Sequence, residues 1–401
     1  MRFLNTLTLS TLFSLGNAGV IARDNKLEIP KTDYDAIVVG GGPAGLSALS
    51  GLARVRRKVL LLDSGEYRNG PTRHMHDVIG SDGVQPAFFR YEARRLLSYY
   101  NTVKMENATV TDIKPKPGNN TWFSVSVTYP GQPSKEITAR KIVLATGLKD
   151  ILPATPGIAE NWGKGIYWCP WCDGHEHADQ SLGLLCPLNK VAGNVREMLT
   201  LNTDIIAFVN GTDNEETRKA ADKDLPQWKE YLKLHNVTID NRTITAVKRI
   251  EDGSTGNKEP WLPSEPEHDL FSVEFTEGAP VQRAAFLTSF PDEQRSDVGE
   301  KAGVKLVNGR LPANNSLGLI TNVPGIYAIG DANTDNITNV PHAMFTGKRA
   351  AVFLHVQLER EQLAVELAGL PKREVELQER DLWDTMNGKR GELLYAGEFD
   401  Q

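Results

Sequence analysis

A glycine-rich turn between an apolar strand and a helix restricts the fold of this chain more than any other feature. Residues 34–39 (Tyr-Asp-Ala-Ile-Val-Val) form a strand-like run, Gly-Gly-Gly-Pro-Ala-Gly follows at positions 40–45, and a helical pattern extends through Leu52. Glycines at this spacing let the backbone approach a pyrophosphate, whose charge is favoured at the N-terminus of the following helix. The turn therefore predicts an α/β domain that binds a dinucleotide.

An acidic residue at the end of the next strand supports this interpretation. The apolar run from Lys58 to Leu62 ends in Asp63, and an acid at this distance from the glycines binds the adenosine ribose in dinucleotide-binding domains. Two later strand-like runs also end in small or polar residues, at 145–147 and 330–332. The residues expected at the cofactor from the glycine-rich turn and the acid are Gly40, Gly42, Pro43, Ala44, Gly45 and Asp63.

Two of the three cysteines form a Cys-Pro-Trp-Cys-Asp-Gly motif that begins at Cys169. A pair at this spacing can alternate between dithiol and disulfide, and Pro170 at a helix start places Cys169 where the helix dipole favours a thiolate. The residues leave three other interpretations open: a structural disulfide, a metal site that also uses His175 and His177, and an inert helix start. We expect a redox pair and no metal.

The order of these motifs resembles that of flavoproteins with two dinucleotide-binding domains, and the cysteine motif between them resembles that of low-molecular-weight thioredoxin reductases. The resemblance covers about residues 33–360 and implies FAD as the cofactor. It implies that Ala145, Thr146 and Gly147 lie at the cofactor and that Gly330 and Asp331 hold the flavin ribitol. It also implies that His342 and Ala343 lie against the flavin ring.

The same resemblance implies roles for the cysteines. Cys172 would face the flavin, and Cys169 would form a mixed disulfide with the substrate. Asp173 would move protons to and from the thiols, with His175 or His177 sharing that work. The predicted catalytic residues are Cys169, Cys172, Asp173, His175 and His342.

Flavin motifs lie at both ends of the region of resemblance, so the flavin-binding domain is expected to be discontinuous. The predicted fold class is α/β with two Rossmann-like dinucleotide-binding domains, the second inserted into the first. The insert has strand patterns at 181–186 and 204–209, helix patterns at 191–201 and 215–234, and a hairpin near 271–275. The predicted boundaries are a flavin-binding domain at 33–150 and 291–360, an insert with the cysteine motif at 151–290, and a helical extension at 361–401.

The insert lacks the residues that bind a nicotinamide nucleotide. Its first strand leads into Leu-Cys-Pro-Leu-Asn-Lys-Val-Ala-Gly at 185–193, which is no glycine-rich turn. Its second strand leads into Asn-Gly-Thr-Asp at 210–213, with no arginine cluster to hold a 2′-phosphate. Cys186 in the first of these segments is expected to be a small buried residue. We expect the insert to keep its fold without binding NADPH.

Loss of the nucleotide site sets the expected direction of electron flow. The chain resembles the secreted fungal FAD-dependent sulfhydryl oxidases and dithiol oxidases related to thioredoxin reductases. This resemblance implies oxidation of small thiols such as glutathione, or of protein thiols, with O2 reduced to H2O2. The alternatives are an NADPH-dependent disulfide reductase, a dithiol oxidase that closes a disulfide in a secondary metabolite, and a flavin-binding protein without turnover.

The first 18 residues have the pattern of a secretory signal peptide, with an apolar run through Leu15 and small residues up to Ala18. A net charge of −6 without a basic cluster argues against nucleic-acid and anionic-membrane partners. We expect a secreted protein without a membrane anchor, and the resemblance implies a homodimer. Glycosylation sequons begin at Asn107, Asn119, Asn210, Asn236, Asn241, Asn314 and Asn336.

Overall fold

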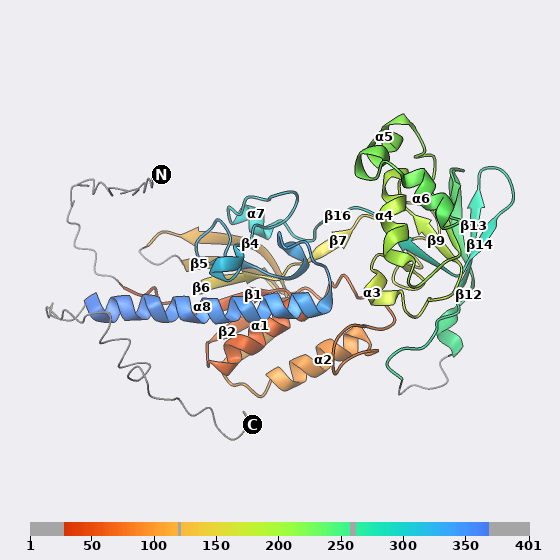
Figure 1. The fold of residues 1–401 in the computed structure, drawn as a ribbon. Coiled ribbons are helices and arrows are strands. Elements are labelled where there is room, and N and C mark those ends of the chain that lie inside the picture. The colour runs from red at the N-terminus through yellow and green to blue at the C-terminus, as the bar shows by residue number, and fades with distance from the viewer. Residues whose placement is uncertain (1–27, 119–121, 257–261, 369–401) are drawn as a thin grey trace, which may run out of the picture. The chain divides into compact units, whose positions relative to one another are not determined.

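The computed structural model, drawn in Figure 1, describes residues 28–118, 122–256 and 262–368. Ile29–Glu361 forms one compact unit. The predicted signal peptide lies outside the described residues. Among the described helices, none has both the length and the hydropathy of a membrane span.

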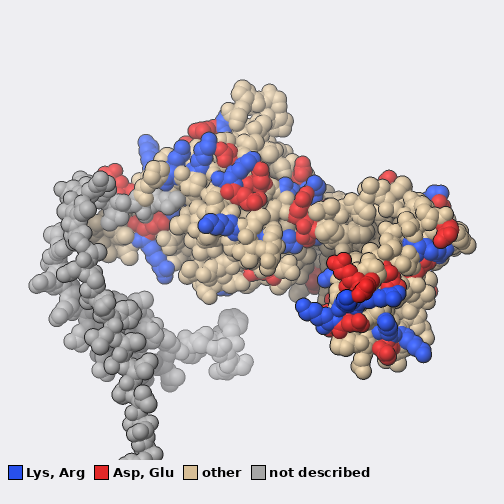
Figure 2. Space-filling view, turned by 90° about the horizontal axis from the view of Figure 1, so that it is seen from above, with Lys and Arg blue, Asp and Glu red and all other residues tan. Residues whose placement is uncertain are grey.

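Charged side chains of both signs share the surface. The chain carries 45 Lys and Arg and 51 Asp and Glu, and the two kinds are intermixed on the face seen in Figure 2. This face therefore lacks the one-sided field that draws a protein to nucleic acid or to an anionic membrane. The expectation of small or neutral partners stays a prediction.

A seven-stranded sheet forms the centre of the domain at 33–150 and 291–360, called the flavin-type domain below. Its strands are β1 (Tyr34–Val39), β2 (Val59–Asp63), β3 (Val103–Asn107), β4 (Thr109–Lys116), β5 (Trp122–Thr128), β6 (Lys135–Leu144) and β17 (Ile326–Ala328). The order is β3-β2-β1-β6-β5-β4, with parallel pairing from β3 to β6 and antiparallel pairing beyond it. β17 pairs in parallel with the end of β6. The sheet is therefore built from both ends of a discontinuous domain.

The two faces of this sheet carry separate cores, because alternate strand residues point to opposite sides. Ala36 and Val38 of β1 belong to one core, and Ile37 and Val39 belong to the other. The second core is completed by β4, β5 and the short helix α7 (Val298–Lys301).

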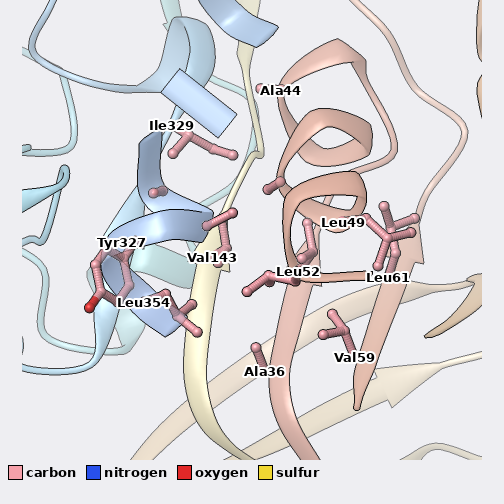
Figure 3. Close-up of a cluster of buried hydrophobic side chains, with 14 of the residues drawn as sticks. Ala36, Ala44, Leu49, Leu52, Val59, Leu61, Val143, Tyr327, Ile329 and Leu354 are labelled. Atoms are coloured by element: carbon pink, nitrogen blue, oxygen red, sulfur yellow. The ribbon is translucent and has the colours of Figure 1, made fainter. Parts of the chain in front are cut away.

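Two helices complete the first core. They are α1 (Pro43–Arg54), which follows β1, and α8 (Val340–Ala368). A Cβ at Gly347 of α8 would lie 2.2 Å from the carbonyl oxygen of Ala44 in α1, so the two helices approach closely. Figure 3 shows their apolar side chains packed on the strands. α2 (Pro86–Leu97) packs beside α1.

A five-stranded parallel sheet forms the inserted domain, in the order β11-β10-β9-β15-β8. Its strands are β8 (Ile166–Tyr167), β9 (Leu182–Leu185), β10 (Ile205–Phe208), β11 (Thr238–Asp240) and β15 (Ala285–Thr288). Its helices are α3 (Pro170–Asp173), α4 (Leu188–Met198), α5 (Glu215–Asp224) and α6 (Trp228–Leu234). An antiparallel sheet of β12 (Ile244–Glu251), β13 (Leu270–Phe275) and β14 (Val281–Arg283) accompanies it.

Two short strands connect the domains. β7 (Leu148–Asp150) leads into the insert and β16 (Asp292–Gln294) leads out of it. They pair antiparallel, with Asp150 directly opposite Asp292. Three short 3-10 helices complete the described elements: η1 (Gly253–Gly256), η2 (Asn315–Leu317) and η3 (Gly330–Ala332).

The observed architecture confirms the predicted fold class, and the hairpin expected near 271–275 is the β12–β13–β14 sheet. The single helix predicted at 215–234 is wrong, because the chain forms α5 and α6 there. Pro226 lies between them; proline lacks an N–H and disfavours a helical residue before it, and Leu225 is extended. The part of the predicted C-terminal extension at 361–368 is helical, and the rest lies outside the described residues.

Candidate active site

The glycine-rich turn after β1 has a conformation that larger residues could not adopt. Gly40 has a φ of +113°, and a Cβ there would lie 2.3 Å from the carbonyl oxygen of Ala145. A Cβ at Gly45 would lie 1.9 Å from the carbonyl oxygen of Gly40. At Gly42, the N-cap of α1, a Cβ would meet no atom within 4 Å. This open space at a helix N-terminus favours an anionic group such as a pyrophosphate.

A cavity of about 340 Å³ begins at this turn. Residues from both ends of the discontinuous domain line it, and they include most of the predicted cofactor residues. Gly45 does not line the cavity. Its missing side chain instead allows α1 to pack closely against the carbonyl oxygen of Gly40. The predicted residues in the lining are Gly40, Gly42, Pro43, Ala44, Asp63, Ala145, Thr146, Gly147, Gly330, Asp331 and Ala343.

Asp63 lies at the end of β2, as predicted, and its carboxylate is held in place by three donors. The hydroxyl of Tyr67 donates to Oδ2 at 2.6 Å, and Arg94 donates to the same oxygen at 2.9 Å. The backbone N–H of Gly65 donates to Oδ1 at 3.0 Å. These contacts fix the orientation of the acid beside the cavity.

Three lining residues have a solvent-shielded polar atom without a hydrogen-bond partner among the described residues. The atoms are the Oγ1 of Thr146, the Nε1 of Trp168 and the Oδ2 of Asp173. An unsatisfied buried polar atom is unfavourable, so these atoms favour a bound group that carries donors and acceptors. Together with the open space at Gly42, they fit a flavin dinucleotide.

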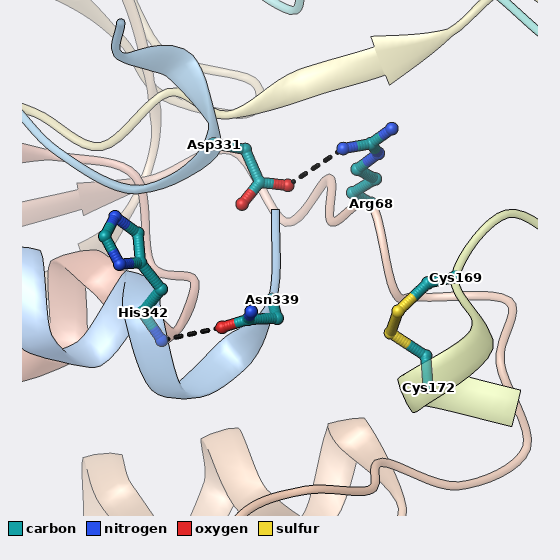
Figure 4. Close-up of a disulfide and its surroundings, with 6 residues drawn as sticks. All are labelled: Arg68, Cys169, Cys172, Asp331, Asn339 and His342. Atoms are coloured by element: carbon teal, nitrogen blue, oxygen red, sulfur yellow. Dashed lines mark hydrogen bonds and ion pairs between the residues drawn. A yellow bond between two sulfur atoms is a disulfide. The ribbon is translucent and has the colours of Figure 1, made fainter. Parts of the chain in front are cut away.

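Cys169 and Cys172 form a disulfide at the start of α3 (Figure 4). Cys169 is the N-cap residue and Pro170 begins the helix, as the sequence predicted. Cys172 lines the cavity together with Trp168 and Trp171, whereas Cys169 does not line it. One cysteine is thus placed at the cofactor cavity and its partner is not, which agrees with the two roles that the resemblance implies.

Asp173 follows Cys172 at the end of α3 and lines the same cavity. Burial raises the pKa of its carboxyl to about 7; nearby His177 opposes the rise, and Glu267 adds to it. A carboxyl that titrates near neutral pH beside a disulfide can hold or release the proton that a cysteine thiol exchanges.

His177 is buried and holds the end of α3 in place. Its Nδ1 lies 2.9 Å from the carbonyl oxygen of Asp173, and its Nε2 lies 3.3 Å from Oδ2 of Asp269. Burial disfavours the charged imidazole, but the hydrogen bonds to Asp269 and Asp173 outweigh this effect, so the pKa of His177 is raised. Both neighbours are acceptors, which the doubly protonated ring satisfies. His175, by contrast, is exposed and does not line the cavity.

An arginine of the flavin-type domain reaches the acids around His177. Arg73 donates to Glu267, to Asp269 at 2.8 Å and to Asp252 at 2.6 Å. One potential metal-ligand atom from each of His177, Glu267 and Asp269 lies within 4.8 Å of the other two, a spacing that a metal ion could use. Arg73 already supplies a positive charge to both acids. The network ties the two domains together next to the disulfide.

His342 lies at the start of α8 but does not line the cavity. Its backbone N–H donates to Asn339 at 2.8 Å, and its Nε2 lies 3.3 Å from Asp335. In Figure 4 its ring points away from the disulfide. The adjacent Ala343 does line the cavity. The predicted flavin contact and catalytic role of His342 have no support in this arrangement and stay predictions.

The loop between β2 and α2 supplies further cavity residues, among them His74 and His76, which with Arg73 form a polar cluster that the sequence alone favours as a plain loop. A run rich in charged residues and histidine directly after Asp63 is the local signal that could have pointed to them. Their positions in the cavity depend on contacts with the distant inserted domain. These lining residues are Arg68, Asn69, Thr72, His74 and His76.

The end of β9, where a nucleotide-binding domain carries its glycine-rich turn, is closed by the chain itself. Pro187 is the N-cap of α4, and Leu188 is 1% exposed. The N–H of Leu188 donates to the hydroxyl of Thr212 at 3.1 Å, from the loop after β10. In that loop Asp213 pairs with Arg218. The first backbone N–H of α4 is therefore hydrogen-bonded to Thr212 of the same domain.

Asp173→Asn is expected to flatten the pH dependence of stability. Between about pH 4 and pH 7 the folded protein keeps a proton on Asp173 that the unfolded chain releases, because the folded pKa is raised to about 7. The free energy of unfolding therefore falls as the pH rises through this range. Melting temperatures between pH 4 and pH 8 should fall less in the variant than in the wild type, and exposed His175→Gln should match the wild type. Superimposable profiles of Asp173→Asn and wild type would contradict the raised pKa.

Comparison with known proteins agrees with this site. Residues 34–191 match the family model described as pyridine nucleotide-disulphide oxidoreductase. A probable thioredoxin reductase of Arthroderma benhamiae is 48% identical over 354 residues, which cover 86% of this chain and 84% of the relative. The thioredoxin reductase aclD of Aspergillus oryzae is 29% identical, over 82% of this chain and 98% of its own.

A solved structure has a similar fold. The crystal structure of HlmI has a TM-score of 0.68 and 28% identity, over 83% of this chain and 95% of that chain. FAD is the cofactor of these oxidoreductases, and the cavity described above fits it. The chain therefore belongs to the pyridine nucleotide-disulphide oxidoreductase family, among its thioredoxin-reductase-like members.

Proposed function

We propose that this flavoprotein is a thiol oxidase. Two thiols and one O2 give one disulfide and one H2O2, so both thiol protons end on the peroxide. The bound FAD supplies the electron chemistry, taking two electrons from the dithiol and passing them to O2. The protein supplies the cysteine pair, the proton-exchanging carboxyl and the shape of the site.

The closed end of β9 is the observation that carries this proposal. A disulfide reductase of this architecture draws electrons from a nicotinamide nucleotide, whose pyrophosphate needs a glycine-rich turn and free N–H groups at the helix N-terminus. Here that place holds Pro187 and the buried Leu188, and Thr212 accepts the first N–H. Arg218, which could otherwise bind a phosphate, forms a bidentate pair with Asp213. In this proposal the electrons come instead from a thiol.

Each residue of the cysteine motif has a defined part in this reaction. A substrate thiolate attacks Cys169, which lies away from the flavin cavity, and the S–S bond to Cys172 breaks. A second substrate thiolate attacks the sulfur that Cys169 has bound and leaves as the disulfide product. Asp173 holds or returns the proton of the Cys172 thiol, for which its raised pKa suits it. Release of the product leaves both cysteines as thiols, and re-forming the Cys169–Cys172 bond beside the cavity gives up the two electrons that the flavin would accept.

The names of the relatives favour a second candidate, an NADPH-dependent disulfide reductase that runs in the opposite direction. That function requires a nucleotide at the insert, where β9 is followed by Pro187 and the capped N–H of Leu188. A dithiol oxidase acting on a secondary metabolite would use the same cysteine chemistry with another substrate. A flavin-binding protein without turnover would need no reactive pair at the cavity.

Anaerobic stopped-flow mixing separates these functions. We expect glutathione or dithiothreitol to bleach the flavin absorbance and NADPH to leave it unchanged. Aerobic assays should then consume one O2 for each two thiols. Rapid bleaching by NADPH would establish the reductase and refute the oxidase, and a flavin that no thiol reduces would leave a binding protein.

We also propose that the protein is secreted, glycosylated and homodimeric. The pattern of residues 1–18 supports secretion, and the sequon asparagines among the described residues are exposed. Protein recovered from culture medium should begin at Gly19 and lose mass on enzymatic deglycosylation. Light scattering should give twice the chain mass. The exposed sequon residues are Asn107, Asn210, Asn236, Asn241, Asn314 and Asn336.

A further inference from the structure

Arg68 contacts three carboxylates at the edge of the flavin cavity. Its Nε and Nη2 donate to the two oxygens of Asp150 at 3.0 and 2.6 Å, which is a bidentate pair. Its Nη1 donates to Asp331 at 3.2 Å (Figure 4), and its Nη2 lies 3.4 Å from Asp292. The side chain is 12% exposed. One guanidinium thus joins the Gly-Asp motif of the cavity to both connecting strands.

The connecting strands need a positive charge at this place. Asp150 and Asp292 are direct partners in the β7–β16 pair, and like charges at such positions destabilise a strand pair. Arg68 contacts both acids. Arg310 pairs with Asp292 at 2.7 Å, but it makes no hydrogen bond to Asp331 among the described residues. Arg68 and Arg310 therefore share the task of neutralising the strands, and Arg68 alone of the two is bonded to the flavin motif.

Arg68 also reaches the residue before the disulfide. Its guanidinium carbon lies 5.3 Å from the ring centroid of Trp168, within the range of a cation–π contact. Trp168 precedes Cys169 and stacks on Trp162 at a centroid distance of 5.0 Å. The ring position of Trp168 is therefore fixed from two sides, by another tryptophan and by Arg68.

We propose that Arg68 is a positioning residue that couples the flavin motif at Asp331 to the placement of the Cys169–Cys172 disulfide. It keeps the Asp331 carboxylate oriented at the cavity edge while its other contacts hold β7, β16 and Trp168 against that carboxylate. Loss of Arg68 therefore weakens flavin binding and misplaces the disulfide at the same time. This coupling goes beyond the proposed function, because it depends on flavin binding and not on the direction of electron flow.

The test compares Arg68→Met, Arg68→Lys and Arg310→Met holoenzymes. Flavin release is followed by flavin fluorescence, and flavin reduction by dithiothreitol is followed by stopped flow. We expect Arg68→Met to raise the FAD dissociation constant at least about tenfold, the effect of one charge-assisted contact. It should also lower the maximal rate of flavin reduction without changing the thiol concentration at half-maximal rate. Arg68→Lys should recover part of both losses, and Arg310→Met should keep the FAD dissociation constant within about twofold.

The outcomes are distinguishable. Equal losses of FAD affinity in Arg68→Met and Arg310→Met would assign the effect to the strand pair and overturn the proposal. An unchanged FAD dissociation constant in Arg68→Met, or a lowered affinity with a normal reduction rate, would overturn it as well. Melting temperatures show whether each variant is folded. If Arg68→Met does not fold, the comparison of Arg68→Lys with the wild type decides the test. Flavin release needs no turnover, so a wild-type protein that no thiol reduces would refute the thiol oxidase and leave the affinity comparison valid.

Discussion

Replacing Cys172 with serine leaves FAD bound and abolishes thiol-driven oxygen consumption, with an expected loss of at least about a thousandfold. Cys172 is the cysteine that lines the flavin cavity, and a serine hydroxyl can neither form a disulfide with Cys169 nor give up electrons. Oxygen uptake with dithiothreitol measures the effect. The flavin absorbance of the purified variant shows that the cofactor is retained.

Cys186→Ala is the matched control for this substitution. Cys186 is buried in the core of the inserted domain, and burial raises the pKa of its thiol to about 12, so it is inert at neutral pH. Its variant should consume oxygen at the wild-type rate. A Cys172→Ser protein that does the same would show that electrons do not enter through the cysteine pair, and the proposed mechanism would be wrong.

The second large effect is expected at Gly42, where alanine should allow folding but prevent FAD binding. Its methyl group would point into the open space at the N-terminus of α1, where the pyrophosphate is favoured. We expect FAD affinity to fall at least about a hundredfold, because the contact with the backbone N–H groups is lost. Alanine at an N-cap costs only about 1 kcal/mol. Flavin content and the melting temperature of the flavin-free protein measure the two effects separately.

Gly45→Ala provides the contrast. Its Cβ would lie 1.9 Å from the carbonyl oxygen of Gly40. This clash should lower the free energy of unfolding by about 1–3 kcal/mol or more, with or without flavin. The melting temperature of the flavin-free protein should therefore fall more in Gly45→Ala than in Gly42→Ala. A Gly42→Ala protein with full FAD content would show that the cofactor does not approach this turn.

The parts of the site that follow from local sequence could be predicted. The strand, turn and helix at 34–54 are specified by adjacent residues, since glycine is required where the backbone is crowded and Pro43 starts the helix. The same holds for Pro170 after Cys169. The return of β17 to β6 was predictable only through the resemblance, because no local pattern specifies which distant strands pair.

The contacts that join the domains could not be predicted, because their partners are far apart in the sequence. Arg68 is separated from Asp150 by 82 residues and from Asp331 by 263, so the loop that carries it reads as an ordinary polar segment. The pKa of Asp173 is likewise set by burial, which is a property of the folded chain. The lack of a glycine-rich turn at 185–193 was visible in the sequence, but the hydrogen bond from the N–H of Leu188 to Thr212 was not.

The β7–β16 pair makes the inserted domain a replaceable module. Because Asp150 and Asp292 face each other, the chain leaves the first domain and returns to it at a single point. A turn of about two residues between these strands would close the first domain without altering its seven-stranded sheet. A chain with such a turn in place of residues 151–291 would keep all seven strands of the first sheet. The inserted domain can therefore change its ligand while the first domain keeps its cofactor.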